Sequence, residues 1–379
     1  MARPRTCRRA VAALGAVGLL LAVAAAQSAA PKGPAPSAPK ADKAVEPPES
    51  AARAPGWKTT KLYGVDYVSL ADVAARLGLK TSWVRAREEL RLEGEGTDLT
   101  FELDKRDLRW NGLRVFFGEP IITHRRMLWM AEIDVRTTLF PLLQPATVPP
   151  AGPLRVIVLD PGHGGTDSGT QNEKLKLHEK TFTLDVAQRL RPLLEARGYK
   201  VVLTREKDTR FHSSPAVDLP MRADFANKAK ADLFVSIHFN ALGNGDVHGI
   251  ETYAFTPGGL RSSGEDERDP DGEKPQPANR HDHWSLVAAG AMHEKLRGQV
   301  EGFDRGLKRA RWAVLRPLAC PGVLVECGFL TNEAEARRIS APAHRQKIAE
   351  GIAAGIDAYA ARVKEATPPP PKRAPAAKS

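Results

Sequence analysis

The chain has 379 residues, of which 42% are hydrophobic and 27% are charged. This is enough for one large hydrophobic core and a smaller one, so two folded domains are expected. The formal net charge of +11 favours anionic partners, but no basic patch is interleaved with aromatic residues, which argues against nucleic acid as the partner.

Residues 1–30 have the organisation of a secretory signal peptide. Four arginines precede an apolar run at residues 10–26, and the alanines at 24–26 give the small-x-small pattern that signal peptidase needs. An uncleaved membrane anchor is the alternative, but the run is short and alanine-rich for a spanning helix. We therefore predict export to the periplasm or extracellular cell wall, with no stable membrane span after cleavage. There the positive charge favours anionic envelope polymers as partners, unless it belongs mainly to the signal segment and linkers.

Three proline-rich segments are predicted to separate or end the folded regions. Residues 31–56, rich in Pro, Ala and Lys, form a linker, residues 145–153 form a hinge, and residues 365–379 form a disordered tail. These limits leave a small domain at residues 57–144 and a larger domain at residues 154–364.

The small domain is predicted to contain short strands and one helix. Ser69 can cap a helix at residues 71–77, which Gly78 can end. Alternating apolar residues predict strands at 90–93, 99–103 and 109–111. On the pattern of residues 67–79, this region resembles the copper amine oxidase N-terminal-like domain found on exported envelope proteins, although it has no cluster of copper ligands. The resemblance implies a wall-binding or positioning module, and a purely stabilising domain is the alternative.

The larger domain is predicted to be an α/β fold, with a twisted, mostly parallel sheet flanked by helices. The apolar run at residues 155–159 is typical of a buried parallel strand, and helical periodicity follows at residues 180–197. The remaining predicted elements are strands at 199–204, 233–237, 250–255 and 323–325 and a helix at 221–230.

Polar residues stand at the carboxyl ends of these strands, where open α/β sheets place their sites. His163 lies in a glycine-rich turn after the first strand, and His238 and Glu326 directly follow two later strands. Glu179 begins the long helix. Two imidazoles and a carboxylate suit a catalytic zinc with an open position for water, and a further carboxylate can move the proton. His163, Glu179 and His238 are the predicted Zn²⁺ ligands, and Glu326 is the predicted general base.

Each of these residues alone has an ordinary structural explanation. A histidine after a strand is more often hydrogen-bonded than metal-bound, Glu179 can stabilise a helix N-terminus, and Glu326 can belong to an ion pair. Their joint occurrence at strand ends favours a site, and no G-x-S-x-G motif offers a serine nucleophile. Cys320 and Cys327 are predicted to be buried thiols, because a disulfide would need a turn between them. Cys327 is expected on the opposite strand face from Glu326.

With these residues identified, the chain resembles the zinc-dependent N-acetylmuramoyl-L-alanine amidases. The motifs follow the family's order: LDPGHGG at 159–165, EK at 179–180, VLTR at 202–205, RA at 222–223, ADLFVSIHFNA at 231–241, GIETY at 249–253 and VLVECGFL at 323–330. The resemblance implies the same three zinc ligands and the same catalytic carboxylate.

The resemblance also implies a reaction, which is hydrolysis of the amide bond between N-acetylmuramic acid and L-alanine in peptidoglycan, for cell-wall remodelling or cell separation. The residue chemistry alone supports zinc-assisted amide hydrolysis. One alternative is a zinc carboxypeptidase or endopeptidase acting on the stem peptide. Another is an inactive wall-binding protein that keeps the fold, against which the presence of all four site residues argues.

Some residues of the larger domain are left open. The polar stretch at residues 256–283 is predicted to be a long surface loop without helical periodicity, either a flexible lid or a passive insertion. His281 and His283 within it can be further metal ligands, although solvated loop histidines are commoner. Arg205 and Arg222 can meet acidic groups of the peptide or act as structural ion-pair partners.

Overall fold

The computed structural model describes residues 56–150, 152–243, 245–264, 272 and 274–367. The predicted signal peptide, nearly all of the predicted linker and the tail beyond residue 367 lie outside the described residues. Within the described part, no helix combines the length and apolar character needed to cross a membrane.

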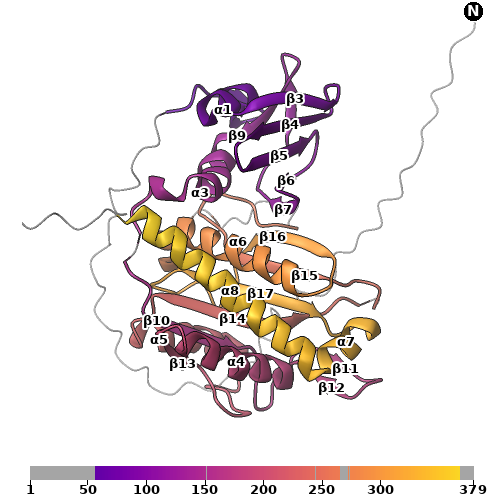
Figure 1. Cartoon of the computed structure of the whole chain (residues 1–379), viewed down its shortest axis with the longest axis vertical. Coiled ribbons are helices and arrows are strands. Elements are labelled where there is room, and N and C mark those ends of the chain that lie inside the picture. The colour runs from indigo at the N-terminus through magenta and orange to yellow at the C-terminus, as the bar shows by residue number, and fades with distance from the viewer. Residues whose placement is uncertain (1–55, 151, 244, 265–271, 273, 368–379) are drawn as a thin grey trace, which may run out of the picture. The chain divides into compact units, whose positions relative to one another are not determined.

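The larger region is built on a mixed, mostly parallel β-sheet (Figure 1). Its strands are β10 Val156–Pro161, β13 Lys200–Leu203, β14 Leu233–Asn240, β15 Ile250–Phe255, β16 Asp304–Ala310 and β17 Gly322–Phe329. The order is β13–β10–β14–β17–β15–β16, and every neighbouring pair is parallel except β17–β15. The predicted α/β class is confirmed.

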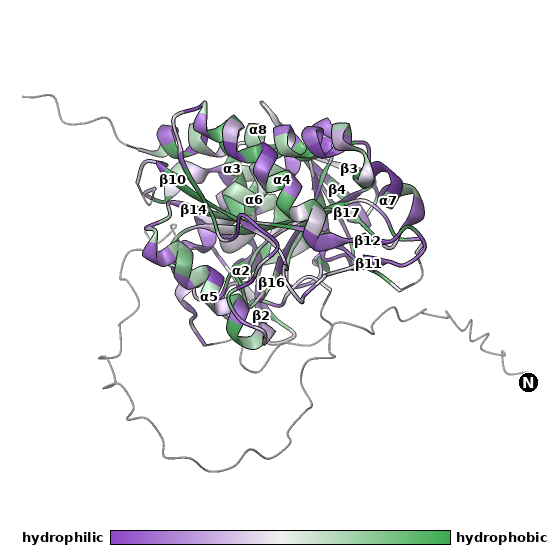
Figure 2. Cartoon of the chain, turned by 90° about the horizontal axis from the view of Figure 1, so that it is seen from below, coloured by the Kyte–Doolittle hydropathy of each residue, from purple (hydrophilic) through white to green (hydrophobic). Residues whose placement is uncertain are grey.

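Helices cover both faces of this sheet. The helices of this region are α4 Glu179–Glu195, α5 Pro215–Lys228, α6 Asp282–Gln299, α7 Glu333–Ser340 and α8 Pro342–Ala366. One hydrophobic core packs α4, α6 and α8 against one face of the strands, and a second core packs α5 against the other face. Figure 2 shows α8 and α5 on opposite sides of the strands. Because successive strand residues point to opposite faces, each strand contributes to both cores.

The sequence analysis does not predict α6 and α8. In α6 every residue from Trp284 to His293 is buried, so the helix lacks the polar face that produces helical periodicity. The loop predicted to extend to residue 283 is correspondingly wrong at its end. Pro277–His281 form a short 3₁₀ helix, η4, and α6 begins directly after it.

The smaller region consists of short strands and helical turns. These are β1 Thr60–Leu62, β2 Val65–Ser69, α1 Leu70–Leu77, β3 Lys80–Arg85, β4 Glu89–Gly94, β5 Thr97–Glu102, β6 Asp107–Trp110, β7 Leu113–Phe116, β8 Ile122–His124, β9 Met127–Ala131, α2 Glu132–Asp134, η1 Val135–Leu139, α3 Phe140–Leu143 and η2 Pro145–Thr147. As predicted, the Ser69 side chain caps α1 by accepting a hydrogen bond from the Asp72 backbone, and Gly78 ends α1 in a left-handed conformation.

The antiparallel strands β3 to β7 continue the large sheet, because β7 pairs with β16 at Val115 and Leu307. The described residues therefore share one eleven-stranded sheet across both regions. The limits predicted for two domains, 57–144 and 154–364, stay a prediction about independent folding.

Gly355 allows α8 to lie directly against α6. A Cβ atom at this position would lie 2.4 Å from the Met292 Cα atom, so the Gly355→Ala variant must push the helices apart. We expect it to lower the free energy of unfolding by about 1–3 kcal/mol, measured by urea denaturation. Gly298→Ala is the matched control, since a Cβ there meets no atom within 4 Å and should stabilise α6 by up to about 1 kcal/mol. Equal stability of the two variants would contradict the close contact.

Candidate metal centre

The four predicted site residues come from three strands and one helix that meet at the same edge of the sheet. His163 follows β10, and Glu179 is the first residue of α4. His238 and Glu326 were predicted to follow their strands. They lie inside β14 and β17, because these strands continue to pair through the two residues. His238 and Glu326 are direct register partners, so their side chains point to the same face of the sheet.

Three of these residues bring their donor atoms together. One ligand atom each from His163, Glu179 and His238 lies within 4.8 Å of the others. Nε2 of His163 is 3.1 Å from Oε2 of Glu179, and Nδ1 of His238 is 3.0 Å from Oε1 of the same carboxylate. The group could hold a metal ion, and imidazole nitrogens with one carboxylate oxygen are donors that suit zinc.

Two glycines pack directly against these donors and leave no room for a larger residue. A Cβ atom at Gly162 would lie 2.2 Å from Cε1 of His238. A Cβ atom at Gly169 would lie 2.5 Å from Oε2 of Glu179 and 2.6 Å from Cδ2 of His163. The backbone of the glycine-rich turn thus encloses the donor atoms, as a preformed metal site requires.

Asp167 orients the first histidine. Its Oδ2 atom lies 2.9 Å from Nδ1 of His163, which leaves Nε2 as the metal-facing nitrogen. Burial opposes protonation of His163, but Glu179 and Asp167 outweigh this effect and raise its pKa to about 10. The sequence analysis missed Asp167, for which the available signal was a carboxylate four residues after His163 in the same turn.

Glu326 is buried beside the three donors. Its Oε2 atom accepts no hydrogen bond from any residue that the structure describes. Burial, followed by the nearby charges of Glu179 and Glu251, raises its pKa well above the ordinary value. A carboxyl group with a raised pKa can accept a proton from a reacting group close by and release it again.

Two buried arginines hold the turn that carries His163. Arg222 donates to Oδ1 of Asp160 at 2.9 Å and to the backbone oxygen of His163 at 2.9 Å. Arg205 donates to the backbone oxygens of Pro161 and Gly162, each at 2.9 Å. The predicted structural ion pair is present for Arg222, with Asp160 and Asp218, whereas Arg205 is held by backbone oxygens.

Other residues considered from the sequence lie apart from the three donors. Nε2 of His283 is 3.1 Å from the backbone oxygen of Pro145, and burial lowers the pKa of His283 to about 4. Burial, followed by the charge of Arg280, lowers the pKa of His281. The prediction of free, buried thiols is confirmed for Cys320 and Cys327.

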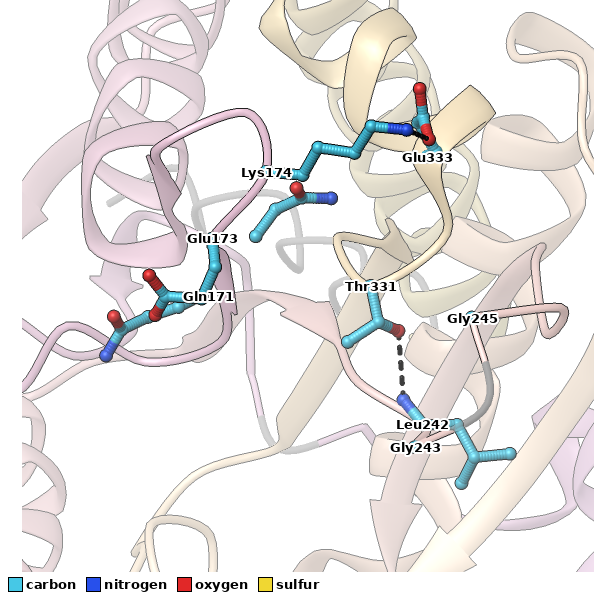
Figure 3. Close-up of a pocket in the computed structure, with 9 residues that line it drawn as sticks. Gln171, Glu173, Lys174, Leu242, Gly243, Gly245, Thr331 and Glu333 are labelled. Carbon is cyan, nitrogen blue, oxygen red and sulfur yellow. Dashed lines mark hydrogen bonds and ion pairs between the residues drawn. The ribbon is translucent and has the colours of Figure 1, made fainter.

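A polar cavity of about 390 Å³ adjoins the elements that supply the donors (Figure 3). Its lining comes from the β11 Gln171–Asn172 and β12 Leu177–His178 hairpin that leads into α4, and from the segments after β14 and β17. Nζ of Lys174 bridges to Oε2 of Glu333 at 2.5 Å, and the Leu242 backbone donates to Oγ1 of Thr331 at 3.1 Å. None of the four predicted site residues lines this cavity.

An α/β sheet with these side chains gathered at its edge is consistent with a hydrolase. The sequence model described as N-acetylmuramoyl-L-alanine amidase matches residues 157–358. The chain belongs to the N-acetylmuramoyl-L-alanine amidase family, which confirms the resemblance found in the sequence. The match does not reach residues 57–144, whose resemblance to the copper amine oxidase N-terminal-like domain stays a prediction.

Individual proteins named as amidases are also similar to this chain in sequence. The chain is 34% identical to the N-acetylmuramoyl-L-alanine amidase AmiC of Escherichia coli O6:H1, over 54% of this chain and 52% of AmiC. It is 32% identical to the germination-specific N-acetylmuramoyl-L-alanine amidase of Bacillus subtilis, over 57% of this chain and 83% of that protein. The catalytic domain of CwlV from Bacillus (Paenibacillus) polymyxa is 31% identical, with a TM-score of 0.44, over 54% of this chain and 98% of the domain. The chain therefore spans about half the length of AmiC.

Gly162→Ala tests whether the glycine-rich turn shapes the donor group. The added Cβ overlaps the His238 ring, so we expect metal affinity to fall about tenfold or more, as when the supporting contacts of a ligand are lost. Competition with a chromophoric chelator measures this affinity. Gly243→Ala is the control, since a Cβ there meets no atom within 4 Å. Unchanged affinity in Gly162→Ala would show that the donors do not use this geometry.

Proposed function

We propose that the protein is a zinc-dependent N-acetylmuramoyl-L-alanine amidase that hydrolyses the amide bond between the lactyl group of N-acetylmuramic acid and L-alanine in peptidoglycan. Family membership supports the bond and the substrate. The observation that carries the proposal is the placement of Glu326 opposite His238, beside the group formed with His163 and Glu179.

The proposed ligands are His163, Glu179 and His238, with Zn²⁺ as the ion. Bound zinc supplies a Lewis acid that polarises the scissile carbonyl and increases the acidity of a water molecule. Burial of Glu179, which is 2% exposed, keeps its carboxylate fixed between the two imidazoles. Asp167 keeps the His163 ring in the orientation that presents Nε2.

Glu326 is the proposed general base and then the general acid. Its carboxylate takes the proton of the attacking water and passes it to the departing amine of L-alanine. Two features support this role: its unpartnered Oε2 atom is free to meet the reacting water, and its raised pKa matches a group that must both accept and release a proton.

The cellular setting is proposed from the sequence. A signal peptide at residues 1–30 would deliver the protein to the periplasm or the extracellular cell wall, where peptidoglycan lies. The positive net charge of +11 would favour contact with anionic envelope polymers. Residues 57–144 are the proposed wall-binding or positioning module.

Glu326→Gln should reduce hydrolysis of purified peptidoglycan by about a thousandfold or more, the order expected when a general base that also delivers the leaving-group proton is lost. Bound zinc, measured by elemental analysis, should stay at the wild-type level, because Glu326 is not a proposed ligand. Glu173→Gln, an exposed carboxylate outside the donor group, serves as the control. Near-normal turnover by Glu326→Gln would remove the assigned role.

Product analysis separates the proposed reaction from its rivals. The amidase releases peptides that begin with L-alanine and leaves glycan without peptide, whereas a carboxypeptidase or endopeptidase cuts within the stem peptide. Removal of zinc with a chelator should stop release, and added Zn²⁺ should restore it. Peptides that lack an amino-terminal L-alanine would replace the proposal with a peptidase.

A further inference from the structure

A row of polar side chains crosses the sheet away from the donor group. Glu326 on β17 is the register partner of Glu251 on β15, so their side chains point to the same face with Cβ atoms about 5 Å apart. Tyr253, two residues along β15 and therefore on the same face, is the partner of Lys308 on β16. The row continues from the proposed catalytic carboxylate to β16.

Glu251 is fully engaged by the protein itself. Its Oε1 atom accepts from Nε of Arg305 at 2.5 Å and from Nζ of Lys308 at 2.8 Å. Its Oε2 atom accepts from the Tyr253 hydroxyl and from Nδ2 of Asn240. The side chain of Glu251 is 3% exposed, so it has neither the lone pairs nor the access to bind a ligand.

Two cations, Arg305 and Lys308, contact the Glu251 carboxylate. Arg305 uses only Nε for Glu251, and its two terminal nitrogens make no hydrogen bond with any described residue. Its side chain is 28% exposed, and the guanidinium lies 5.1 Å from the Phe329 ring. The guanidinium therefore presents a free pair of donors to solvent.

The smaller region closes the far end of the row. Nζ of Lys308 lies 5.4 Å from the ring of Phe116 on β7, and Arg114 of the same strand stacks over that ring at 4.4 Å. Arg114 is already paired with Asp107 at 2.8 Å, so it adds no free charge. Arg305 is the more exposed of the two cations on β16, at 28% of its side chain against 15% for Lys308, and both of its terminal nitrogens are available.

We infer that Arg305, supported by Lys308, binds a carboxylate of the stem peptide on the amine side of the scissile bond. This inference rests on the proposed function and names the substrate group that the site selects. A guanidinium edge is the protein group that best matches a carboxylate, through two parallel hydrogen bonds.

The spacing fits the second or third residue of the peptide. Two interstrand spacings separate β17 from β16, which is about 10 Å. An extended peptide covers this distance in about three residues. A peptide that starts at Glu326 and crosses the strands therefore brings a carboxylate carried by its second or third residue to Arg305.

The experiment compares two probes on the zinc-loaded full chain carrying Glu326→Gln, so that binding is measured without turnover. One probe is an N-acetylmuramoyl tripeptide with free carboxylates on its second and third residues, and the other carries carboxamides there. We expect calorimetry to show about tenfold tighter binding of the free acid. Adding Arg305→Gln should reduce this preference to about one by weakening only the free acid, and Arg305→Lys should restore part of it.

Arg197→Gln is the matched control, because Arg197 follows α4 and makes a comparable ion pair with Asp357 of α8. This variant should prefer the free-acid probe over the carboxamide probe as strongly as the Glu326→Gln protein does. If Arg305→Gln weakens the binding of both probes equally, Arg305 has a structural role and the inference is overturned. The inference is also overturned if the Glu326→Gln protein binds both probes with equal affinity or binds neither. Failure of the proposed function would be seen differently. The wild-type protein would then release no L-alanyl peptides from peptidoglycan, whatever the two probes show.

Discussion

The buried ion pair between Arg222 and Asp160 is the interaction on which the donor group depends. His163 has a positive φ of 63°, a conformation that a non-glycine residue keeps only when its surroundings hold it. Arg222 supplies that hold by donating to the His163 backbone oxygen, while Asp160 and Asp218 balance its charge. All three side chains are buried, so the loss of Arg222 would leave two carboxylates in the core without this cation.

The order of strands then brings distant parts of the chain into one row. The parallel neighbours β10, β14 and β17 end at a common edge, so His163, His238 and Glu326 meet there although up to 163 positions separate them in the chain. The antiparallel strand β15 places the start of its own sequence, at Glu251, beside the end of β17. Because β15 runs antiparallel to β17, Glu251 lies between the donor group and the two cations on β16, Arg305 and Lys308.

The α/β class and the convergence of the four predicted residues at one edge of the sheet could be predicted from the sequence because their signals are local. A short apolar strand followed by a polar residue marks a sheet edge, and Glu179 opens a helix with visible periodicity. Arg305 carries no such mark, since its importance arises from the β15–β16 pairing, which the sequence does not reveal. Helix α6 was missed for the opposite reason, because burial on all sides removes the polar face that would have displayed it.

The pairing of β7 with β16 has a consequence for how the protein can be divided. A chain cut before residue 154 would leave β16 as the last strand of its sheet, with its backbone donors and acceptors and the apolar side chain of Leu307 uncovered. Such an edge readily recruits strands from other molecules. In the described residues, β7 of the amino-terminal region covers this edge by pairing with β16.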